Sequence, residues 1–392
     1  MQSVKREPKM NAAESLQTNV SEQSNGAVVS RILVRGVNWL GDAVMTTPAL
    51  RRLRELHPGA RVTLLMPEKI ADLFVGHPDV DEVLTFAIGE GPWRVGRRLR
   101  SKRFDLAVVF PNSPRSALEV WFTGARRRVG YARSWRSLFL TDAISARVDE
   151  RPMRKRGADE IRRLISGPAG RPVSFPAQAH HIHQYLHLIR AIGGSAEACE
   201  PRLHVTDAER AAGAARLGNR TSIWIGLNAG AEYGPAKRWP IDRFISVAKR
   251  LAKEPGCGLI LFGGKSDAPL TSEIEQAVHS ALPLATVVDV AGRTSLRDLC
   301  SLMSLCRVVL TNDTGPMHVA AAVGATVVVP FGSTSPELTG PGLPGAGRHA
   351  FLRGSAPCSP CFLRECPIDF RCMTATSEDA VMGAVLGAIG RS

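Results

Sequence analysis

Along this chain, short apolar runs typical of strands alternate with segments in which apolar residues recur at the period of a helix. Short apolar runs typical of buried strands, at 31–34, 61–66 and 82–86, are separated by segments of helical period at 43–57 and 67–76. The alternation continues through 94–103, 105–111 and 114–124. Strands and helices in turn favour a mainly parallel sheet covered by helices. We therefore predict a doubly wound α/β domain that begins near residue 30.

The same alternation starts again after a stretch of prolines and turn residues. Its strands and helices are expected at 222–230, 241–253, 258–264, 270–281, 286–292, 295–306, 307–313, 316–324 and 325–332. A chain of 392 residues has the length of two domains. We predict an N-terminal Rossmann-like domain over 30–200, a linker region over 201–221 and a C-terminal Rossmann-like domain over 222–392. Two α/β domains of similar size favour a ligand site in the cleft between them.

The first 29 residues do not share this pattern. They are polar and lack the apolar core of a secretion signal, so we expect a disordered leader over 1–29. No apolar run in the chain has the length of a membrane span. We therefore expect a cytoplasmic protein.

Positive charge is concentrated in the N-terminal half. The net charge is +14, and residues 1–200 contribute +11 of it, with 31 Lys and Arg against 20 Asp and Glu. Such an excess favours an anionic partner, which could be nucleic acid, an anionic membrane surface or a phosphorylated substrate. Arg126, Arg127 and Arg128, followed by Tyr131 and Trp135, are candidates for holding lipid or sugar phosphates. A solvated surface is the simpler interpretation of these arginines.

Two loops of the C-terminal domain have the composition of a phosphate site. In 228–240, small residues follow a strand and let the backbone approach a ligand, with Lys237 beside them. In 311–324, a strand ends and a regular helix begins with Pro316 in its first turn. A helix start offers free N–H groups and a positive dipole to a diphosphate. The alternative is that Asp313 or Thr314 simply caps this helix.

The first strand is followed by an acid where a nucleotide-binding loop would offer glycines and a lysine. Asp42 lies in 36-GVNWLGDAV-44 and would repel a diphosphate. Because strand carboxyl ends face the cleft in such folds, we predict that Asp42 is a general base there. We expect Gly41 to let the turn bend tightly and the positive end of the next helix to keep Asp42 ionised. The alternative is that Asp42 caps the helix 43–57.

Four segments together resemble the ADP-heptose:lipopolysaccharide heptosyltransferases, glycosyltransferase family 9. They are 35-RGVNWLGDAVMTTPALRRLR-54, 228-NAGAEYGPAKRWP-240, 261-LFGGKSD-267 and 311-TNDTGPMHVAAAVG-324. The resemblance implies a GT-B fold, with two Rossmann-like domains facing a cleft. It also implies inverting, metal-independent transfer of L-glycero-D-manno-heptose from ADP-heptose onto the inner core of a lipid A–Kdo acceptor, by an enzyme placed peripherally at the cytoplasmic face of the inner membrane.

The resemblance also assigns roles to individual residues. Asp42 matches the catalytic acid of the family, and Lys237 matches its phosphate-contacting lysine. The donor-binding turn is matched by Asp313, Thr314, Gly315 and His318. Asp267 matches an acid that meets the ribose. The arginines at 126–128 are expected to meet the anionic acceptor.

Two groups of residues have side chains that can ligate metal. Cys358, Cys361, Cys366 and Cys372 are spaced C-x2-C-x4-C-x5-C, which could hold a structural Zn2+ or an iron–sulfur cluster. Reduced thiols or a labile disulfide are the alternatives. The histidines of 180–187 are expected to form the polar face of a helix near the domain junction instead.

Three other classes of protein compete with this interpretation. A GT-B glycosyltransferase with another donor or acceptor would share the same loops. A nucleic-acid-binding protein would explain the charge but not the paired loops, so we expect no nucleic acid partner. A dinucleotide-dependent dehydrogenase would need G-x-G-x-x-G after its first strand, and that motif is absent there.

Overall fold

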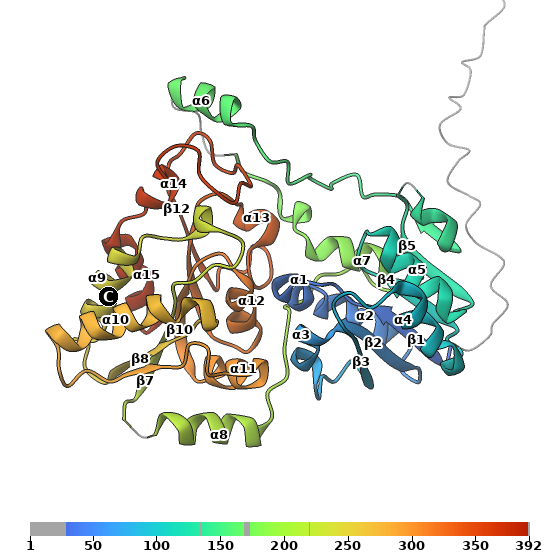
Figure 1. Cartoon of the computed structure of the whole chain (residues 1–392), viewed down its shortest axis with the longest axis horizontal. Helices are drawn as coiled ribbons and strands as arrows, with labels where there is room; N and C mark the ends of the chain where they lie inside the picture. Colours follow the sequence, from blue (N-terminus) through green and yellow to red (C-terminus); the bar gives the residue numbers. More distant parts are fainter. Residues whose placement is uncertain (1–28, 134, 168–172, 219, 391–392) are drawn as a thin grey trace, which may run out of the picture.

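Two parallel six-stranded sheets form the framework of the protein (Figure 1). The structure is a computed structural model that describes residues 29–133, 135–167, 173–218 and 220–390. The expected leader lies outside the described residues except for its last position. The predicted α/β class with two doubly wound sheets is confirmed, since the strand orders are β3-β2-β1-β4-β5-β6 and β12-β11-β10-β7-β8-β9.

The N-terminal sheet is covered by helices on both faces. Its strands are β1 (Arg31–Arg35), β2 (Arg61–Pro67), β3 (Glu82–Phe86), β4 (Leu106–Val109), β5 (Arg127–Tyr131) and β6 (Asp142–Ile144). Its helices are α1 (Leu40–Met45), α2 (Thr47–Leu56), α3 (Glu68–Ala71), α4 (Pro92–Arg98), α5 (Pro114–Thr123) and α7 (Ile182–Ala191). Successive side chains of β1 point to opposite faces of the sheet. Ile32 and Val34 pack with α1, α2 and α7, whereas Leu33 packs with α4 and α5.

The C-terminal sheet repeats this arrangement. Its strands are β7 (Ile223–Asn228), β8 (Cys257–Leu261), β9 (Val287–Asp289), β10 (Cys306–Thr311), β11 (Thr326–Phe331) and β12 (Ala350–Arg353). Its helices are α8 (Asp207–Leu217), α9 (Ile241–Leu251), α10 (Ala268–Ala281), α11 (Leu296–Ser304), α12 (Gly315–Ala322), α13 (Pro336–Thr339), α14 (Arg371–Thr374) and α15 (Glu378–Ala388). None of the helices in the described ranges is both long and apolar enough to cross a bilayer.

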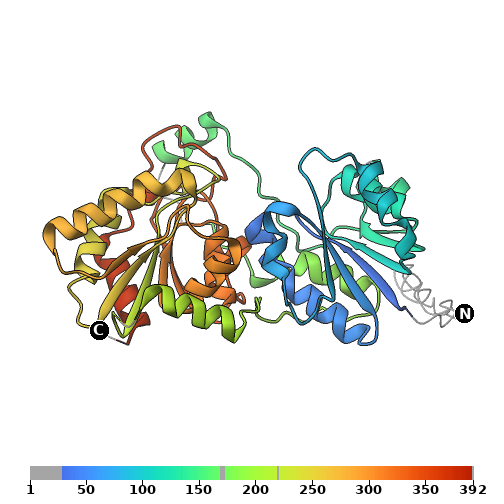
Figure 2. The same ribbon diagram turned by 60° about the horizontal axis from the view of Figure 1, so that its bottom comes forward.

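The domains meet through α1 and α12, which lie against each other at the junction (Figure 2). One apolar cluster runs through both domains, from Val44 on α1 to Val319 on α12. The loops that follow β1, β7 and β10 all open at this junction. The fold therefore places the loop that carries Asp42, the loop 228–240 and the turn before α12 around one cleft.

The chain crosses between the domains more often than the predicted boundaries allow. Helix α6 (Ala158–Ser166) lies on the C-terminal domain, with Ile161 buried in the same apolar cluster as Leu227 (Figure 1). The Arg156 N–H donates to the Cys361 carbonyl at 3.0 Å. The chain then returns to the N-terminal domain as α7. The segment 30–200 is therefore not a single unit as predicted, because its helix α6 packs on the C-terminal domain.

Most of the predicted linker 201–221 is helix α8. A capping box starts it, because the Thr206 hydroxyl accepts from the Glu209 N–H and the Glu209 carboxylate accepts from the Thr206 N–H. The helix packs on α11, and the Arg297 guanidinium binds Glu209 at 2.6 Å. Its residues 207–217, DAERAAGAARL, contain few large apolar side chains, so their period does not stand out in the sequence.

Candidate active site

A cavity of about 430 Å³ lies between the two domains, and Asp42 is part of its wall. The N-terminal domain contributes Trp39, Leu40, Gly41, Asp42 and Met45. The C-terminal domain contributes Glu232, Tyr233, Lys237, Asp313, Thr314, Gly315, Pro316, His318, Thr334, Thr339 and Phe362. Met153 and Lys155 reach it from the segment that crosses between the domains. The cavity thus brings together Asp42, Lys237 and the residues of the predicted donor-binding turn.

Asp42 is not the cap of its helix. Trp39 occupies the N-cap position of α1 and its side chain makes no capping bond, while Asp42 lies in the first turn. Burial raises the pKa of the Asp42 carboxyl, and the nearby His181 and Lys237 offset only part of this rise. Burial therefore acts against the ionised form that the start of the helix was expected to favour.

Gly41 serves close packing between the domains instead of a tight turn. A Cβ atom on Gly41 would lie 2.7 Å from Cδ2 of His318. A Cβ atom on Gly315 would lie 2.9 Å from Cβ of Leu40 in the same contact. The two glycines let α1 and α12 approach each other. As a result, Asp42 and the start of α12 face one cavity.

Lys237 is held beside the cavity by an acid. Its Nζ lies 2.7 Å from Oδ2 of Asp313 and 4.9 Å from the centre of the Tyr233 ring. The Thr334 hydroxyl donates to the same Asp313 oxygen. Asp313 therefore positions the lysine, and neither it nor Thr314 makes a side-chain bond that caps α12. The capping alternative for this turn is wrong.

Asn312 joins the two C-terminal loops, a role that the sequence did not suggest. Its Oδ1 accepts from the Trp239 N–H at 2.9 Å, and its Nδ2 donates to the Ala229 carbonyl at 2.7 Å. Asn312 is fully buried, so these bonds fix the loop 228–240 against the turn before α12. The only feature of the sequence that could have indicated this role is the position of Asn312 directly after a buried strand.

His318 is buried in the first turns of α12, where it packs on Gly41. Burial lowers the pKa of His318 to about 4, although Asp313 opposes this shift. The imidazole is therefore neutral at pH 7 and adds no positive charge for a diphosphate. Its place at the cavity is as expected, and its packing across the domain junction is the new feature.

A second cavity of about 410 Å³ lies on the other side of the start of α12. It shares Leu40, Glu232, Thr314 and Pro316 with the first cavity, and Asp267, Leu296 and Leu299 are part of its own wall. The Asp267 carboxylate accepts from the Gly264 N–H at 3.0 Å. It fills the space that Gly230 leaves by having no Cβ. Asp267 is thereby brought next to the loop that carries Lys237.

The arginines at 126–128 lie at the opposite edge of the sheet from Asp42. They stand at the amino end of β5, whereas Asp42 follows the carboxyl end of β1. Arg127 binds Asp142 at 2.8 Å, and Arg126 lies 3.8 Å from Asp105. Arg128 donates to the Phe139 and Ala125 carbonyls. The structure does not bring Arg126, Arg127 and Arg128 to the cleft, so the expected acceptor role at these positions is corrected.

The cysteine cluster is part of the wall behind the cavity. Cys358, Cys361 and Cys372 are buried in the apolar cluster of the C-terminal domain, and all four thiols are free. The Cys361 and Phe362 N–H groups donate to the Ser333 carbonyl, next to Thr334. Among the described residues, no group of three or more His, Cys, Asp or Glu could hold a metal ion. The expected zinc or iron–sulfur site at Cys358, Cys361, Cys366 and Cys372 thus has no support in the structure.

The histidines of 180–187 lie at the domain junction, as expected. The His180 ring, however, is buried and its Nε2 lies 3.0 Å from the Gly340 carbonyl. The His181 N–H donates to the Leu338 carbonyl at 2.9 Å, and its ring stacks on Tyr185. Histidines at the start of α7 therefore tie the returning chain to the C-terminal domain.

Two Rossmann-like domains with a carboxylate on one wall of the cleft and a lysine on the other are the arrangement expected of a GT-B glycosyltransferase. The family model of glycosyltransferase family 9 (heptosyltransferase) matches residues 92–159 and 151–370. The protein belongs to this family.

Relatives and solved structures agree with this assignment. Lipopolysaccharide heptosyltransferase 2 of Salmonella typhimurium is 32% identical over 319 residues, which cover 79% of this chain and 85% of the relative. The structure of Escherichia coli ADP-heptose lps heptosyltransferase II superposes with a TM-score of 0.71 at 27% identity, covering 92% of this chain and 98% of that one. A family 9 glycosyl transferase from Veillonella parvula shares the fold, with a TM-score of 0.74 at 23% identity over 93% of this chain and 98% of that one.

Proposed function

We propose that this protein transfers L-glycero-D-manno-heptose from ADP-heptose to the lipopolysaccharide inner core, with a heptosyl-Kdo-lipid A acceptor. The observation that carries the proposal is that Asp42 and Lys237 face one cavity from opposite domains. A base and a cation across a cleft are what an inverting transfer with a diphosphate leaving group needs. The names of the relatives, lipopolysaccharide heptosyltransferase 2, support this donor and acceptor.

Asp42 is the general base of the proposed reaction. Its carboxylate takes the proton of the acceptor hydroxyl while that oxygen forms a bond to the anomeric carbon. The bond from this carbon to the diphosphate breaks, and its electron pair leaves with ADP. Attack from the face opposite the leaving group inverts the configuration. A raised pKa suits this role, because a stronger base accepts the proton more readily.

Lys237 and the start of α12 stabilise the departing ADP. The ammonium group supplies a full positive charge, and the N–H groups of the first turn of α12 supply partial ones. Asp313 keeps the lysine pointing to this place. We propose that these groups do the work that a divalent cation does in other transferases, so that the reaction requires no metal cofactor.

The donor spans both cavities in this proposal. The heptose and the diphosphate occupy the cavity that Asp42 and Lys237 share, and the adenosine occupies the neighbouring one. Asp267 accepts hydrogen bonds from the ribose hydroxyls there, and Leu296 and Leu299 contact the adenine. Thr314, Gly315 and Pro316, at the start of α12, lie between the two parts of the donor.

The acceptor enters from the N-terminal domain. A cavity of about 290 Å³ lies at the carboxyl ends of β1, β2 and β3, lined in part by Asn38, Trp39, Lys69 and Arg115. Trp39 also lines the cavity that contains Asp42, so an acceptor sugar held here reaches the base. Lys69 and Arg115 offer charge to acidic sugars and phosphates, in the place of Arg126, Arg127 and Arg128. The enzyme then works in the cytoplasm at the inner-membrane surface, without a nucleic acid partner.

An assay of ADP release tests this function. Purified protein is given ADP-heptose with heptosyl-Kdo-lipid A, and product mass is measured beside ADP. We expect one ADP and one added heptose per turnover, with far slower release from UDP-glucose or ADP-glucose. Equal or faster transfer from either of these donors, or transfer only to another acceptor, would contradict the proposal.

A further inference from the structure

The helix α4 and the loop before it form an exposed cationic and aromatic surface. Residues 92–103 contain six Lys or Arg and no Asp or Glu. Val95, Gly96 and Leu99 are buried against the domain, which leaves Trp93 and the arginines facing outward. Helix α4 lies beside α5 on the side of the N-terminal domain that is remote from the C-terminal domain (Figure 1). We call Ile88, Trp93, Arg94, Arg97, Arg100 and Arg103 the α4 surface.

Four arginines of the α4 surface have no carboxylate partner among the residues that the structure describes. They are Arg94, Arg97, Arg100 and Arg103. The neighbouring Arg98 lies 3.6 Å from Glu90 and Lys102 lies 2.6 Å from Glu82, so the acids in reach are already used. The uncompensated charge therefore has to be balanced by solvent ions or by an anionic partner.

Large apolar side chains stand among these charges. Ile88 is 85% exposed and Trp93 is 54% exposed. The guanidinium of Arg97 lies over the Trp93 ring at 5.2 Å, and Nζ of Lys69 lies over the Trp39 ring at 5.0 Å. Tryptophan beside Lys or Arg is the composition found where proteins meet the headgroup layer of a bilayer, because the ring is amphipathic and the cation meets lipid phosphates.

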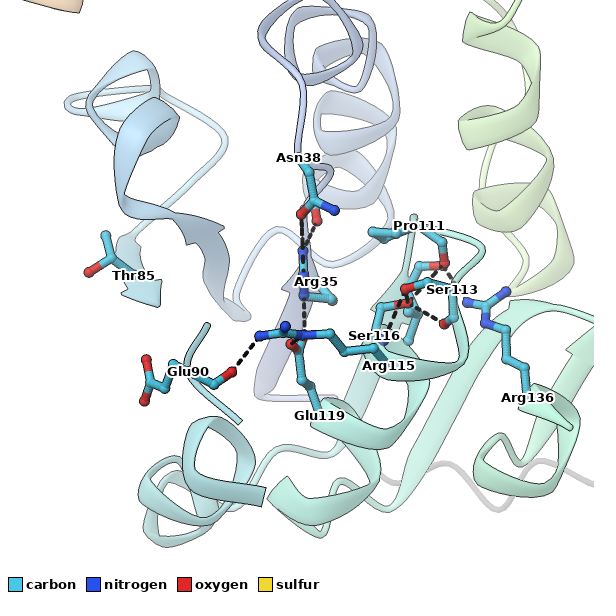
Figure 3. Close-up of polar contacts among 12 residues, drawn as sticks. Arg35, Asn38, Thr85, Glu90, Pro111, Ser113, Arg115, Ser116, Glu119 and Arg136 are labelled. Atoms are coloured by element: carbon cyan, nitrogen blue, oxygen red, sulfur yellow. Dashed lines mark hydrogen bonds and ion pairs between the residues drawn. The ribbon is translucent and has the colours of Figure 1, made fainter. Parts of the chain in front are cut away.

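Hydrogen bonds hold the loop that carries Ile88 at the rim of the 290 Å³ cavity proposed for the acceptor. Ile88 and Gly89 line this cavity, and Gly89 has a φ of +89°. Arg115 donates to the Glu90 carbonyl on one side of the loop, while Arg98 donates to the Thr85 carbonyl on the other. Figure 3 shows Arg115 between Glu90 and Glu119, with its ion pair to Glu119 at 2.8 Å. The exposed Ile88 therefore lies between two anchored backbone positions, Thr85 and Glu90.

We propose that the α4 surface docks the enzyme on an anionic lipid bilayer, so that a lipid-anchored acceptor enters the cavity without leaving the membrane. The inference rests on the proposed acceptor. Trp93 and Ile88 enter the headgroup layer, and Arg94, Arg97, Arg100 and Arg103 meet lipid phosphates. The acceptor sugars pass Ile88 and Trp39 to reach Asp42. The α4 surface is remote from the C-terminal domain, so docking leaves the donor cleft open.

Vesicle binding tests this surface. The full-length protein is sedimented with vesicles of phosphatidylethanolamine and phosphatidylglycerol, and with phosphatidylcholine vesicles, at 0.15 M salt. We expect binding only to the anionic vesicles. Arg94→Ser with Arg97→Ser should weaken it roughly thirtyfold, from the cost of losing two cations near an anionic surface. Trp93→Ser should weaken it as well. The control, Arg162→Ser with Arg163→Ser, removes the same charge from exposed positions on α6.

Transfer assays separate this inference from the proposed function. With the acceptor in vesicles, the α4 variants should raise KM while kcat stays unchanged. With a deacylated, water-soluble acceptor, they should match the wild type. Equal losses in the α6 control, or DNA duplex binding as tight as vesicle binding, would overturn the inference. If the wild type transferred no heptose to either acceptor, the proposed function would fail, and the vesicle results would still decide whether this surface binds lipid.

Discussion

At the scale of single residues, the chemistry depends on one acid and one cation in facing walls. Asp42 and Lys237 are 195 positions apart in the chain, and each belongs to a different domain. Burial raises the pKa of Asp42, and an ion pair with Asp313 of its own domain holds Lys237. Each residue can therefore be tested by a change that leaves its surroundings in place.

Asp42→Asn should abolish most of the turnover. Asn keeps the size of the side chain but accepts no proton, so we expect kcat to fall on the order of 10²–10⁴-fold. The protein should fold and bind ADP as the wild type does, which thermal unfolding and calorimetry would check. In the wild type, kcat should fall with acid as Asp42 becomes protonated, at a pH above the usual range of an aspartate. Near-wild-type turnover in the variant would assign the base to another residue.

Lys237→Ala should weaken the binding of ADP. A charge-assisted hydrogen bond to a phosphate is worth roughly 1.5–3 kcal/mol, so we expect the Kd to rise about tenfold or more. Titration calorimetry with ADP measures this directly. Lys249→Ala, on α9, removes the same charge away from both cavities and serves as the control. An unchanged Kd in Lys237→Ala would separate this lysine from the diphosphate.

At the scale of elements, the position of helix α1 depends on its contact with α12. It has six residues, too few to be stable alone, and it lies against α12 where two glycines remove the side chains that would keep them apart. The end of β1 is anchored below it by a buried ion pair, in which Nε of Arg35 lies 2.6 Å from Glu119 (Figure 3). Burial lowers the pKa of Arg35, and Glu119 opposes that shift.

Gly315→Ala should force α1 and α12 apart. The new methyl group would meet Cβ of Leu40, which is tied to the backbone and cannot turn away. We expect a loss of about 1–3 kcal/mol in the free energy of unfolding, together with a lower kcat. Gly383→Ala on α15 has open space around it and should instead add up to about 1 kcal/mol, because alanine favours a helix. Urea unfolding of both variants gives the comparison.

Glu119→Ala should destabilise the N-terminal domain strongly. It leaves the buried guanidinium of Arg35 without its partner, which costs roughly 3–5 kcal/mol. Glu55→Ala breaks ion pairs with Arg51 and Arg52 at the surface of α2 and should cost about 1 kcal/mol or less. If urea unfolding showed equal losses of stability for the two substitutions, the charge of Arg35 would have to be balanced by a group other than Glu119.

At the scale of the whole molecule, the domains are joined by more than a linker. The apolar cluster that runs through α1 and α12, the helix α6 on the C-terminal domain and the histidines before α7 all hold them together. His180 before α7 and His318 on α12 are both buried and neutral at pH 7, since burial lowers the pKa of His180 to about 3 and that of His318 to about 4. The junction is therefore sensitive to acid.

Stability should fall between about pH 6.5 and pH 4. In this range the unfolded chain binds a proton on His318 that the folded protein excludes, so the free energy of unfolding decreases as the pH falls. One such group contributes at most about 1.4 kcal/mol for each pH unit. In His318→Gln, the loss of stability from pH 7 to pH 5 should be smaller than in the wild type. If His318→Gln and the wild type lost the same free energy of unfolding between pH 7 and pH 5, the prediction would be contradicted.

The local structure and the kind of chemistry could be predicted from the order of the amino acids. Strands such as 31–34 are apolar on both sides because parallel strands are buried on both faces, and that period gave the two doubly wound domains. Asp42, Lys237 and the turn before α12 were visible because they follow such strands. Their motifs also gave the family, which the comparisons show.

Which of these residues meet, and what surrounds them, follows from how the folded chain packs. Arg126, Arg127 and Arg128 had the right charge but lie at the wrong edge of the sheet, since charge carries no information about strand direction. The contact of Gly41 with His318, the pairing of Lys237 with Asp313 and the packing of α6 on the C-terminal domain join positions far apart in the chain. The pKa of Asp42 follows from the same cause, because burial by two domains exists only once both have folded and met.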